Sequence, residues 1–166
     1  MEQKIKEVTL LFPGQGSQYV GMGSFFSDKN GSKEILQSAD QTLGYSLSSL
    51  MNNGPEEDLT LTKNTQPAIL THSMMIFSQV KNFLEKNNIQ TSRVLGHSVG
   101  EYGALVAAKA MSFEQALKSV HHRGKFMQEA VEPGAGKMVA ILKVPLEVVK
   151  SGCDAISNEK EKVMPA

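Results

Sequence analysis

Apolar residues along this chain gather in short runs that alternate with amphipathic stretches. Residues 8–12 (VTLLF) are almost continuously apolar and are closed by Pro13-Gly14, which predicts a strand covered on both faces. Residues 68–84 are rich in apolar side chains nearly all round, which is typical of a buried helix. Residues 93–95 then predict a second short strand. This order of strand, helix and strand favours an α/β fold with at least partly parallel strands.

Turn and capping residues place the boundaries of the other elements. Asn64 and Pro67 are typical of the first turn of a helix, so the buried helix is expected to open there. The polar region before it, as far as about Met51, is predicted to be helical, and Asn53-Gly54-Pro55 is a turn. The remaining pattern predicts, in order, two helices, a strand and a last helix, at residues 99–111, 113–130, 137–144 and 145–156.

The composition then excludes several kinds of partner. Of the 166 residues, 40% are hydrophobic and 20% charged, as is usual for one soluble core. The 17 basic residues balance 17 acidic ones, so no net field draws the chain to nucleic acid or to a membrane surface. No apolar run reaches the roughly 20 residues of a membrane helix, and no signal-peptide pattern opens the chain. Cys153 is the single cysteine, which excludes an intramolecular disulfide, argues against a cysteine-based metal site and favours the cytoplasm.

The segment Gly96-His97-Ser98-Val99-Gly100 has the form G-x-S-x-G between a predicted strand and a predicted helix. In that setting the motif is typical of a nucleophile elbow, which holds its serine in a strained backbone conformation. Glycine two residues before and after the serine avoids collisions where the backbone comes close. The helix that follows directs free N–H groups toward the serine, where they stabilise an oxyanion. Ser98 is therefore the candidate nucleophile, against a chance match in a glycine-containing loop.

A second loop, Gly14-Gln15-Gly16, follows the first predicted strand. It is not a nucleotide-binding loop, because Tyr19 stands where the dinucleotide fingerprint needs its third glycine and no G-K-[ST] follows. The loop is expected at the carboxyl edge of the sheet, where ligands bind and where Ser98 is also expected. A loop N–H and the Gln15 side chain are candidates for a second oxyanion donor. The alternative is a tight turn with a solvated glutamine.

Arg123 is predicted on the flank of an apolar helical stripe. Helical spacing puts the following residues on one face: Phe113, Ala116, Leu117, Val120 and Met127. The guanidinium of Arg123 then either extends past the edge of the core into solvent or meets an anion. A substrate carboxylate is the second alternative, because the planar guanidinium matches it with two hydrogen bonds.

No histidine is a convincing catalytic base by position. Strand alternation turns His97 away from its neighbour Ser98. His72 lies within the buried helix, where a hydrogen-bonded core histidine is expected. His121 and His122 are expected to be partly or wholly solvated.

Four motifs in register resemble those of one enzyme family. LFPGQGSQ (11–18), NTQPA (64–68), GHSVGEY (96–102) and RGKFMQEAV (123–131) closely resemble malonyl-CoA:acyl-carrier-protein transacylase of type II fatty-acid synthesis. The likeness runs over essentially the whole chain. It implies that malonyl passes from coenzyme A to the phosphopantetheine thiol of acyl carrier protein through an ester on Ser98. No cofactor is implied, since the coenzyme A thioester is the substrate.

The resemblance also implies roles for the other candidates. Gln15 and Val99 would form the oxyanion hole through their backbone N–H groups, and Gln15 and His97 would lie in the substrate-binding site. Arg123 would bind the free carboxylate of malonyl, so an acetyl group, which leaves this arginine unpaired, would be a poor substrate. Malonyl-CoA and acyl carrier protein are the implied partners, and a monomer is expected at full length.

The resemblance further implies the fold and the extent of the chain. A hydrolase-like α/β core with parallel strands would occupy residues 1–133, and a small ferredoxin-like subdomain would begin over residues 134–166. Family members are nearly twice as long, and their catalytic histidine lies in the part after Ala166. We therefore expect a truncated chain that has a nucleophile and a carboxylate-binding arginine but no base. A serine hydrolase of acyl thioesters and a non-catalytic fragment are the alternatives.

Overall fold

The computed structural model describes residues 6–24, 29, 31–130, 136 and 138–165. The chain divides into two compact units, Met1–Val131 and Glu132–Ala166. The boundary that the sequence predicts, between residues 133 and 134, lies outside the described residues.

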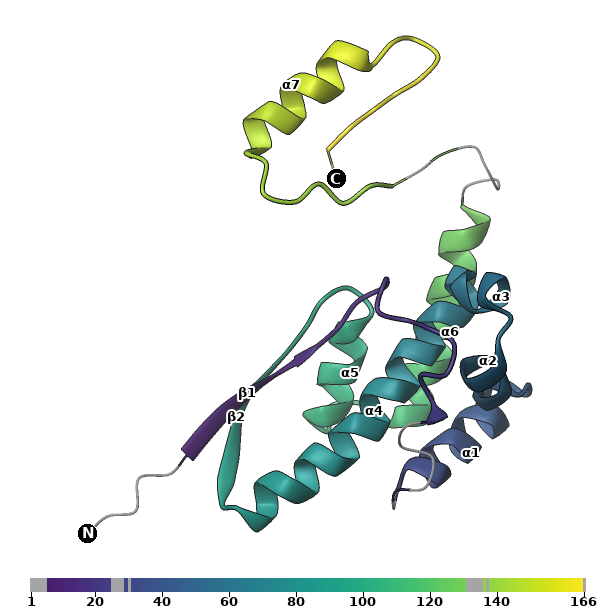
Figure 1. The fold of residues 1–166 in the computed structure, drawn as a ribbon, viewed down its shortest axis with the longest axis vertical. Coiled ribbons are helices and arrows are strands. Elements are labelled where there is room, and N and C mark those ends of the chain that lie inside the picture. Colours follow the sequence, from purple (N-terminus) through teal and green to yellow (C-terminus); the bar gives the residue numbers. More distant parts are fainter. Residues whose placement is uncertain (1–5, 25–28, 30, 131–135, 137, 166) are drawn as a thin grey trace. The chain divides into compact units, whose positions relative to one another are not determined.

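The first unit contains a parallel pair of strands, β1 (Lys6–Phe12) and β2 (Ile89–Gly96). In their register Leu10 lies opposite Val94, and Phe12 lies opposite Gly96. A long helical connection brings the chain back in the same direction, as a parallel pair requires (Figure 1). The predicted mixture of helices with parallel strands is confirmed, and both strands are longer than their apolar runs suggest.

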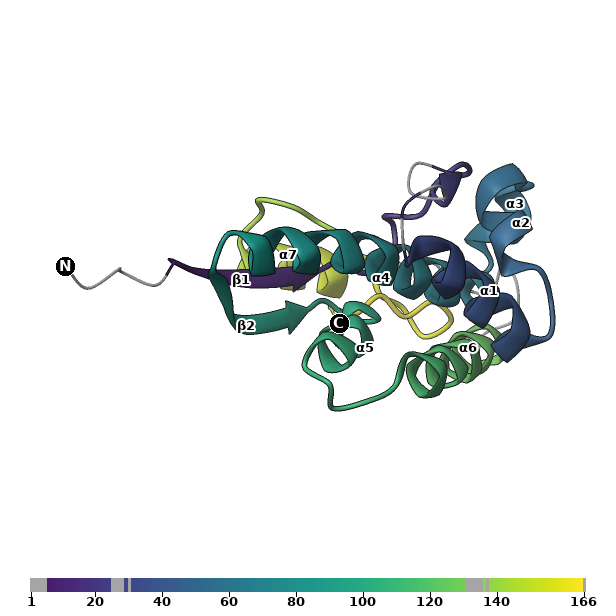
Figure 2. The ribbon, with the colours of Figure 1, turned by 90° about the horizontal axis from the view of Figure 1, so that it is seen from below.

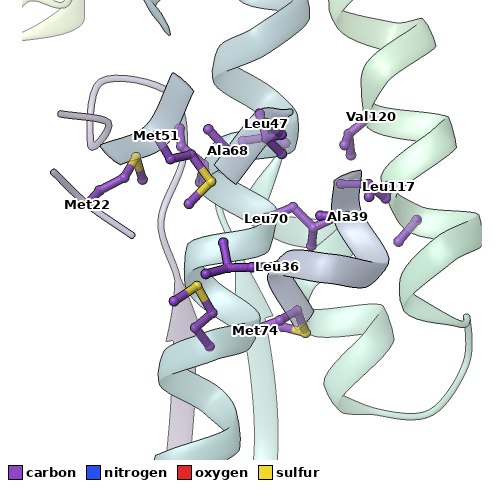
Figure 3. Packing of buried hydrophobic residues seen from close by; sticks show 14 of the residues in the cluster. Met22, Leu36, Ala39, Leu47, Met51, Ala68, Leu70, Met74, Leu117 and Val120 are labelled. Carbon is purple, nitrogen blue, oxygen red and sulfur yellow. The ribbon is translucent and has the colours of Figure 1, made fainter. Parts of the chain in front are cut away.

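Helices make up most of the rest of this unit. In its described part they are α1 (Ser32–Leu43), α2 (Leu47–Asn53), α3 (Glu56–Thr60), α4 (Thr62–Lys86), α5 (Gly100–Ala107) and α6 (Phe113–Glu129). Figures 1 and 2 show α4 next to α6, with α1 packed against both. Their buried apolar side chains form one cluster, part of which Figure 3 shows. Among the described residues, no helix is both long enough and apolar enough to span a bilayer.

Alternate residues of β1 face different surroundings. The buried ring of Phe12 meets Phe77 of α4 edge to face, with ring centroids 6.1 Å apart, and also lies against Gly103 of α5. Leu11 is 74% exposed, and its cross-strand partner Leu95 is 54% exposed. The prediction of a strand covered on both faces is therefore wrong. Both helices contact the side that Phe12 faces, and no described segment of the first unit covers the side that Leu11 faces.

The central helix α4 is buried, as its apolar composition predicts, and residues 65–71 are all inaccessible to solvent or nearly so. The helix begins two residues before Asn64, and no side chain caps it, so the predicted helix start is wrong. Pro67 lies inside the helix and cannot donate to the carbonyl of Lys63.

The junction between α5 and α6 is set by two helix-end signals. The helix predicted over residues 99–111 is shorter, because Lys109 adopts a left-handed backbone with φ 60° and the N–H of Ala110 bonds back into the last turn of α5. Ser112 then opens α6 in a capping box with Gln115, each side chain accepting from the other's backbone N–H. The observed α6 confirms the helix predicted over residues 113–130 to within one residue.

The second unit contains α7 (Leu146–Ile156), which confirms the last predicted helix. The strand predicted over residues 137–144 is wrong for the described residues 138–144, whose backbone is irregular. Met138 and Leu142 are 89% and 77% exposed. A strand is stable only when a neighbour completes its backbone hydrogen bonds, and no described segment of the second unit pairs with this one.

Gly124 lies where α6 approaches α4. A Cβ at this position would lie 2.5 Å from the Thr62 carbonyl oxygen and 2.8 Å from Lys63 Cα. We expect Gly124→Ala to lower the free energy of unfolding by about 1–3 kcal/mol, although alanine is the better helix former. Urea unfolding followed by circular dichroism measures the change. Gly152→Ala in α7 is the control, since no atom lies within 4 Å of its added Cβ, and it should be neutral or stabilising. Unchanged stability of Gly124→Ala would contradict the close approach.

Candidate active site

Ser98 lies on a sharp turn between β2 and α5. Its φ is 54°, in the left-handed region that a residue with a side chain rarely adopts. The N–H of His97 still donates to the carbonyl of Phe12 at 3.1 Å, so the parallel pairing runs up to the turn. The N–H of Gly100 donates to the carbonyl of His97 at 2.9 Å, and α5 starts at once. The hydroxyl is thereby presented where a strand ends and a helix begins.

The two glycines of the elbow are required by close backbone approaches. A Cβ at Gly96 would lie 2.2 Å from the carbonyl carbon and oxygen of Gly100. A Cβ at Gly100 would lie 2.3 Å from the carbonyl oxygen of Phe12. Real side chains do not fit at such distances without a backbone shift. The collision argument made from the sequence is confirmed, and the strained turn at Ser98 depends on both positions.

Arg123 reaches the elbow from α6. Its Nη2 donates to Ser98 Oγ at 3.1 Å, and its Nη1 donates to Gln66 Oε1 at 2.6 Å. The arginine is half-buried, and its guanidinium turns inward from the flank of the helix. Of the two alternatives left open by the sequence, extension into solvent is not adopted. Most of the predicted stripe is buried or partly buried, but Met127 is 47% exposed.

Gln66 is a site residue that sequence reasoning missed. Its side chain is fully buried in α4, where Oε1 accepts from Arg123 and Nε2 donates toward Met127 Sδ at 3.3 Å. The sequence carried only a weak signal: Gln66 lies just before the apolar stretch of residues 68–84, and an amide that is buried there needs a hydrogen-bonding partner. Nothing in the sequence identified Arg123, 57 residues away, as that partner.

The Gly14-Gln15-Gly16 loop lies against the elbow. A Cβ at Gly14 would lie 2.4 Å from His97 Nδ1, so the imidazole packs directly on the loop backbone. Both segments therefore lie at the carboxyl edge of the parallel pair, as predicted. The Gln15 side chain is exposed and makes a long contact of 3.5 Å from Nε2 to Thr62 Oγ1. No hydrogen bond joins Gln15 to Ser98 among the described residues.

Among the described residues, no histidine ring hydrogen-bonds the serine hydroxyl, which pairs with Arg123 instead. His72 is about half-buried, and burial lowers its pKa, an effect that the nearby Met22 backbone partly opposes. Burial also lowers the pKa of His121, and His122 is exposed. Within the described part of the chain, the hydrogen bond that Ser98 Oγ accepts comes from Arg123. The described residues thus bring together a serine, an arginine and a buried glutamine.

Comparison with known proteins identifies the family of this chain. Residues 9–164 match the model of a family described as acyl transferase domain. The chain is 43% identical over 163 residues to the malonyl CoA-acyl carrier protein transacylase of Bacillus subtilis, which covers 98% of this chain and 50% of that protein. A protein of the same name from Staphylococcus aureus is 38% identical, with 98% and 51% covered. The chain spans about half the length of the curated relatives it matches.

Solved structures agree with these relatives. The malonyl CoA-acyl carrier protein transacylase of Clostridium perfringens superposes with a TM-score of 0.77 and 42% identity, over 90% of this chain and 46% of that one. A malonyl-transacylase solved in complex with a type II PKS acyl-carrier protein superposes with a TM-score of 0.80 and is 39% identical. That match covers 91% of this chain and 48% of the other. Sequence, fold and elbow therefore agree that this chain belongs to the acyl transferase domain family.

Proposed function

We propose that this chain carries the nucleophile and the carboxylate-binding residue of a malonyl-CoA:acyl-carrier-protein transacylase that serves fatty-acid synthesis. The observation that carries the proposal is the 3.1 Å contact between Arg123 Nη2 and Ser98 Oγ. A cation beside the nucleophile suits a short acyl group that ends in a carboxylate, and an esterase for uncharged acyl groups has no need of it. The names of the relatives support the same substrate and the same partner.

The reaction has two halves. In the first, Ser98 Oγ attacks the thioester carbonyl of malonyl-CoA, the carbon–sulfur bond breaks, and coenzyme A leaves as its thiol with the serine's proton. In the second, the phosphopantetheine thiol of the carrier attacks the malonyl ester, and Ser98 regains a proton as the carbon–oxygen bond breaks. A general base must carry this proton, and the resemblance to the family places a histidine for that purpose after residue 166. The proposal therefore concerns the full-length enzyme.

The oxyanion of each half-reaction is proposed to lie between the two loops at the carboxyl edge of the strands. The N–H of Val99 is next to the nucleophile, at the start of α5, where the helix dipole favours negative charge. The N–H of Gln15 would supply the second donor, because its loop is packed against the elbow through His97. Both side chains, Gln15 and His97, are exposed at this edge and are proposed to contact the bound substrate.

The finer architecture belongs to the same proposal. Residues 1–133 would form part of a hydrolase-like core, and residues 134–166 would begin a ferredoxin-like subdomain that includes α7. The match of the family model as far as residue 164, on relatives about twice as long, supports this assignment. A cytoplasmic monomer that uses no cofactor or metal remains our prediction for the full-length enzyme.

The proposed acyl-enzyme can be tested by intact-mass measurement. We expect the protein, at the full length of its relatives, to gain the mass of one malonyl group from malonyl-CoA and to lose it to holo acyl carrier protein. Ser98→Ala should gain nothing, because no other hydroxyl lies on the elbow. Ser92→Ala, an exposed serine on β2, is the matched control and should behave as the wild type. Free malonate without malonyl-carrier product would indicate a hydrolase, and an unmodified wild type would indicate a non-catalytic protein.

The role of Arg123 predicts a change in acyl selectivity. Arg123→Ala should lower kcat/KM for malonyl-CoA by about 100-fold or more, because charge-assisted bonds to the carboxylate are lost. Transfer from acetyl-CoA should be kept or improved. Lys125→Ala, an exposed cation on the same helix that pairs with Glu129, controls for the loss of charge. Equal losses for both acyl groups would contradict a carboxylate-binding role.

A further inference from the structure

The guanidinium of Arg123 donates to two side-chain acceptors, and only one of these acceptors is chemically unchanged during the proposed reaction. The first is Ser98 Oγ, which accepts from Nη2 in the free protein. Once this oxygen carries the acyl group it is an ester oxygen, which is a weaker acceptor than a hydroxyl. The second is Gln66 Oε1, which accepts from Nη1 at 2.6 Å and takes no part in bond making. Gln66 is therefore the anchor that can hold the guanidinium throughout the cycle.

The buried amide of Gln66 has a fixed orientation. Arginine only donates hydrogen bonds, so the atom that faces Arg123 Nη1 must be the amide oxygen. The amide nitrogen then faces Met127 Sδ at 3.3 Å, a weak acceptor one helical turn beyond Arg123 on α6. The side chain is fully buried, and so are its chain neighbours Thr65 and Pro67. With no access to water, this amide has little freedom to exchange its partners.

The chemistry of this anchor matters because it is neutral. A carboxylate at position 66 would also hold Nη1, but it would neutralise the guanidinium and compete with any anionic substrate. An apolar side chain would leave the buried side of Arg123 without an acceptor. The amide oxygen orients the cation and leaves its positive charge for a ligand that enters beside Ser98.

We propose that Gln66 is a positioning residue that holds the Arg123 guanidinium beside Ser98 through a neutral acceptor, and so sets the preference for malonyl over uncharged acyl groups. This inference rests on the proposed transacylase function. It assigns to α4 a part in substrate selection, besides its place at the centre of the hydrophobic core. The close approach of α4 and α6 at Gly124 brings the two side chains within hydrogen-bonding distance.

The test compares malonyl-CoA with acetyl-CoA in the full-length enzyme. Gln66→Glu keeps the size of the side chain and is expected to lower kcat/KM for malonyl by about 10- to 100-fold, mainly through KM, because the new carboxylate competes for the guanidinium. Transfer from acetyl-CoA should stay within about threefold of the wild type. Gln66→Met, which removes the acceptor at similar volume, should also lower malonyl transfer selectively, by about 10-fold.

The control separates positioning from packing. Thr71→Val alters another fully buried polar side chain of α4 and should leave the ratio of malonyl to acetyl transfer unchanged. A purely structural role for Gln66 would lower transfer of both acyl groups together with the melting temperature, and that result would overturn the inference. Only the role of Gln66 is refuted in one further case: the wild type prefers malonyl, Arg123→Ala loses that preference, and both Gln66 variants keep it. A wild type without malonyl preference refutes the proposed function and this inference together.

Discussion

The hydrogen bond from the Arg123 guanidinium to the Ser98 hydroxyl joins the two parts of the chain on which the site depends. One part is a backbone turn that holds Ser98 at positive φ, and the other is a helix that delivers a cation to that turn. Neither part is sufficient for the proposed chemistry. An elbow alone fits any acyl group, and an arginine on a helix flank alone is usually solvated. Their contact is the basis for proposing an acyl group with a negative end as the substrate.

The core explains why the two parts meet. Helix α4 lies at the centre of the first unit. Its Phe77 contacts Phe12 of β1, and its first turn packs against Gly124 of α6. The absence of a side chain at Gly124 lets the backbone of α6 approach the first turn of α4, and Gln66 lies one turn further along α4. The packing of α4 against α6 thus sets the distance between the side chains of Gln66 and Arg123. In this protein the hydrophobic core and the proposed binding site depend on the same contact between α4 and α6.

Local features of the site could be read from the sequence, and features that depend on distant partners could not. The elbow at Ser98 is specified by five consecutive residues, because the collisions that require its glycines occur within the turn and with the adjoining strand. Helical periodicity placed Arg123 on the flank of α6 but left its partner open, since Gln66 and Ser98 come close only after α4 and α6 have packed. The strand predicted at residues 137–144 failed for a related reason. Alternating side chains give a segment the capacity to be a strand, but a neighbouring strand must complete its hydrogen bonds.

A crystal structure of the full-length enzyme trapped as its malonyl ester would show directly whether Arg123 binds the acyl group. We expect the ester on Ser98 Oγ, with the malonyl carboxylate on the guanidinium of Arg123 and with Nη1 still bonded to Gln66. An ester on Ser98 whose carboxylate points to solvent, or an acyl group on another residue, would contradict this expectation.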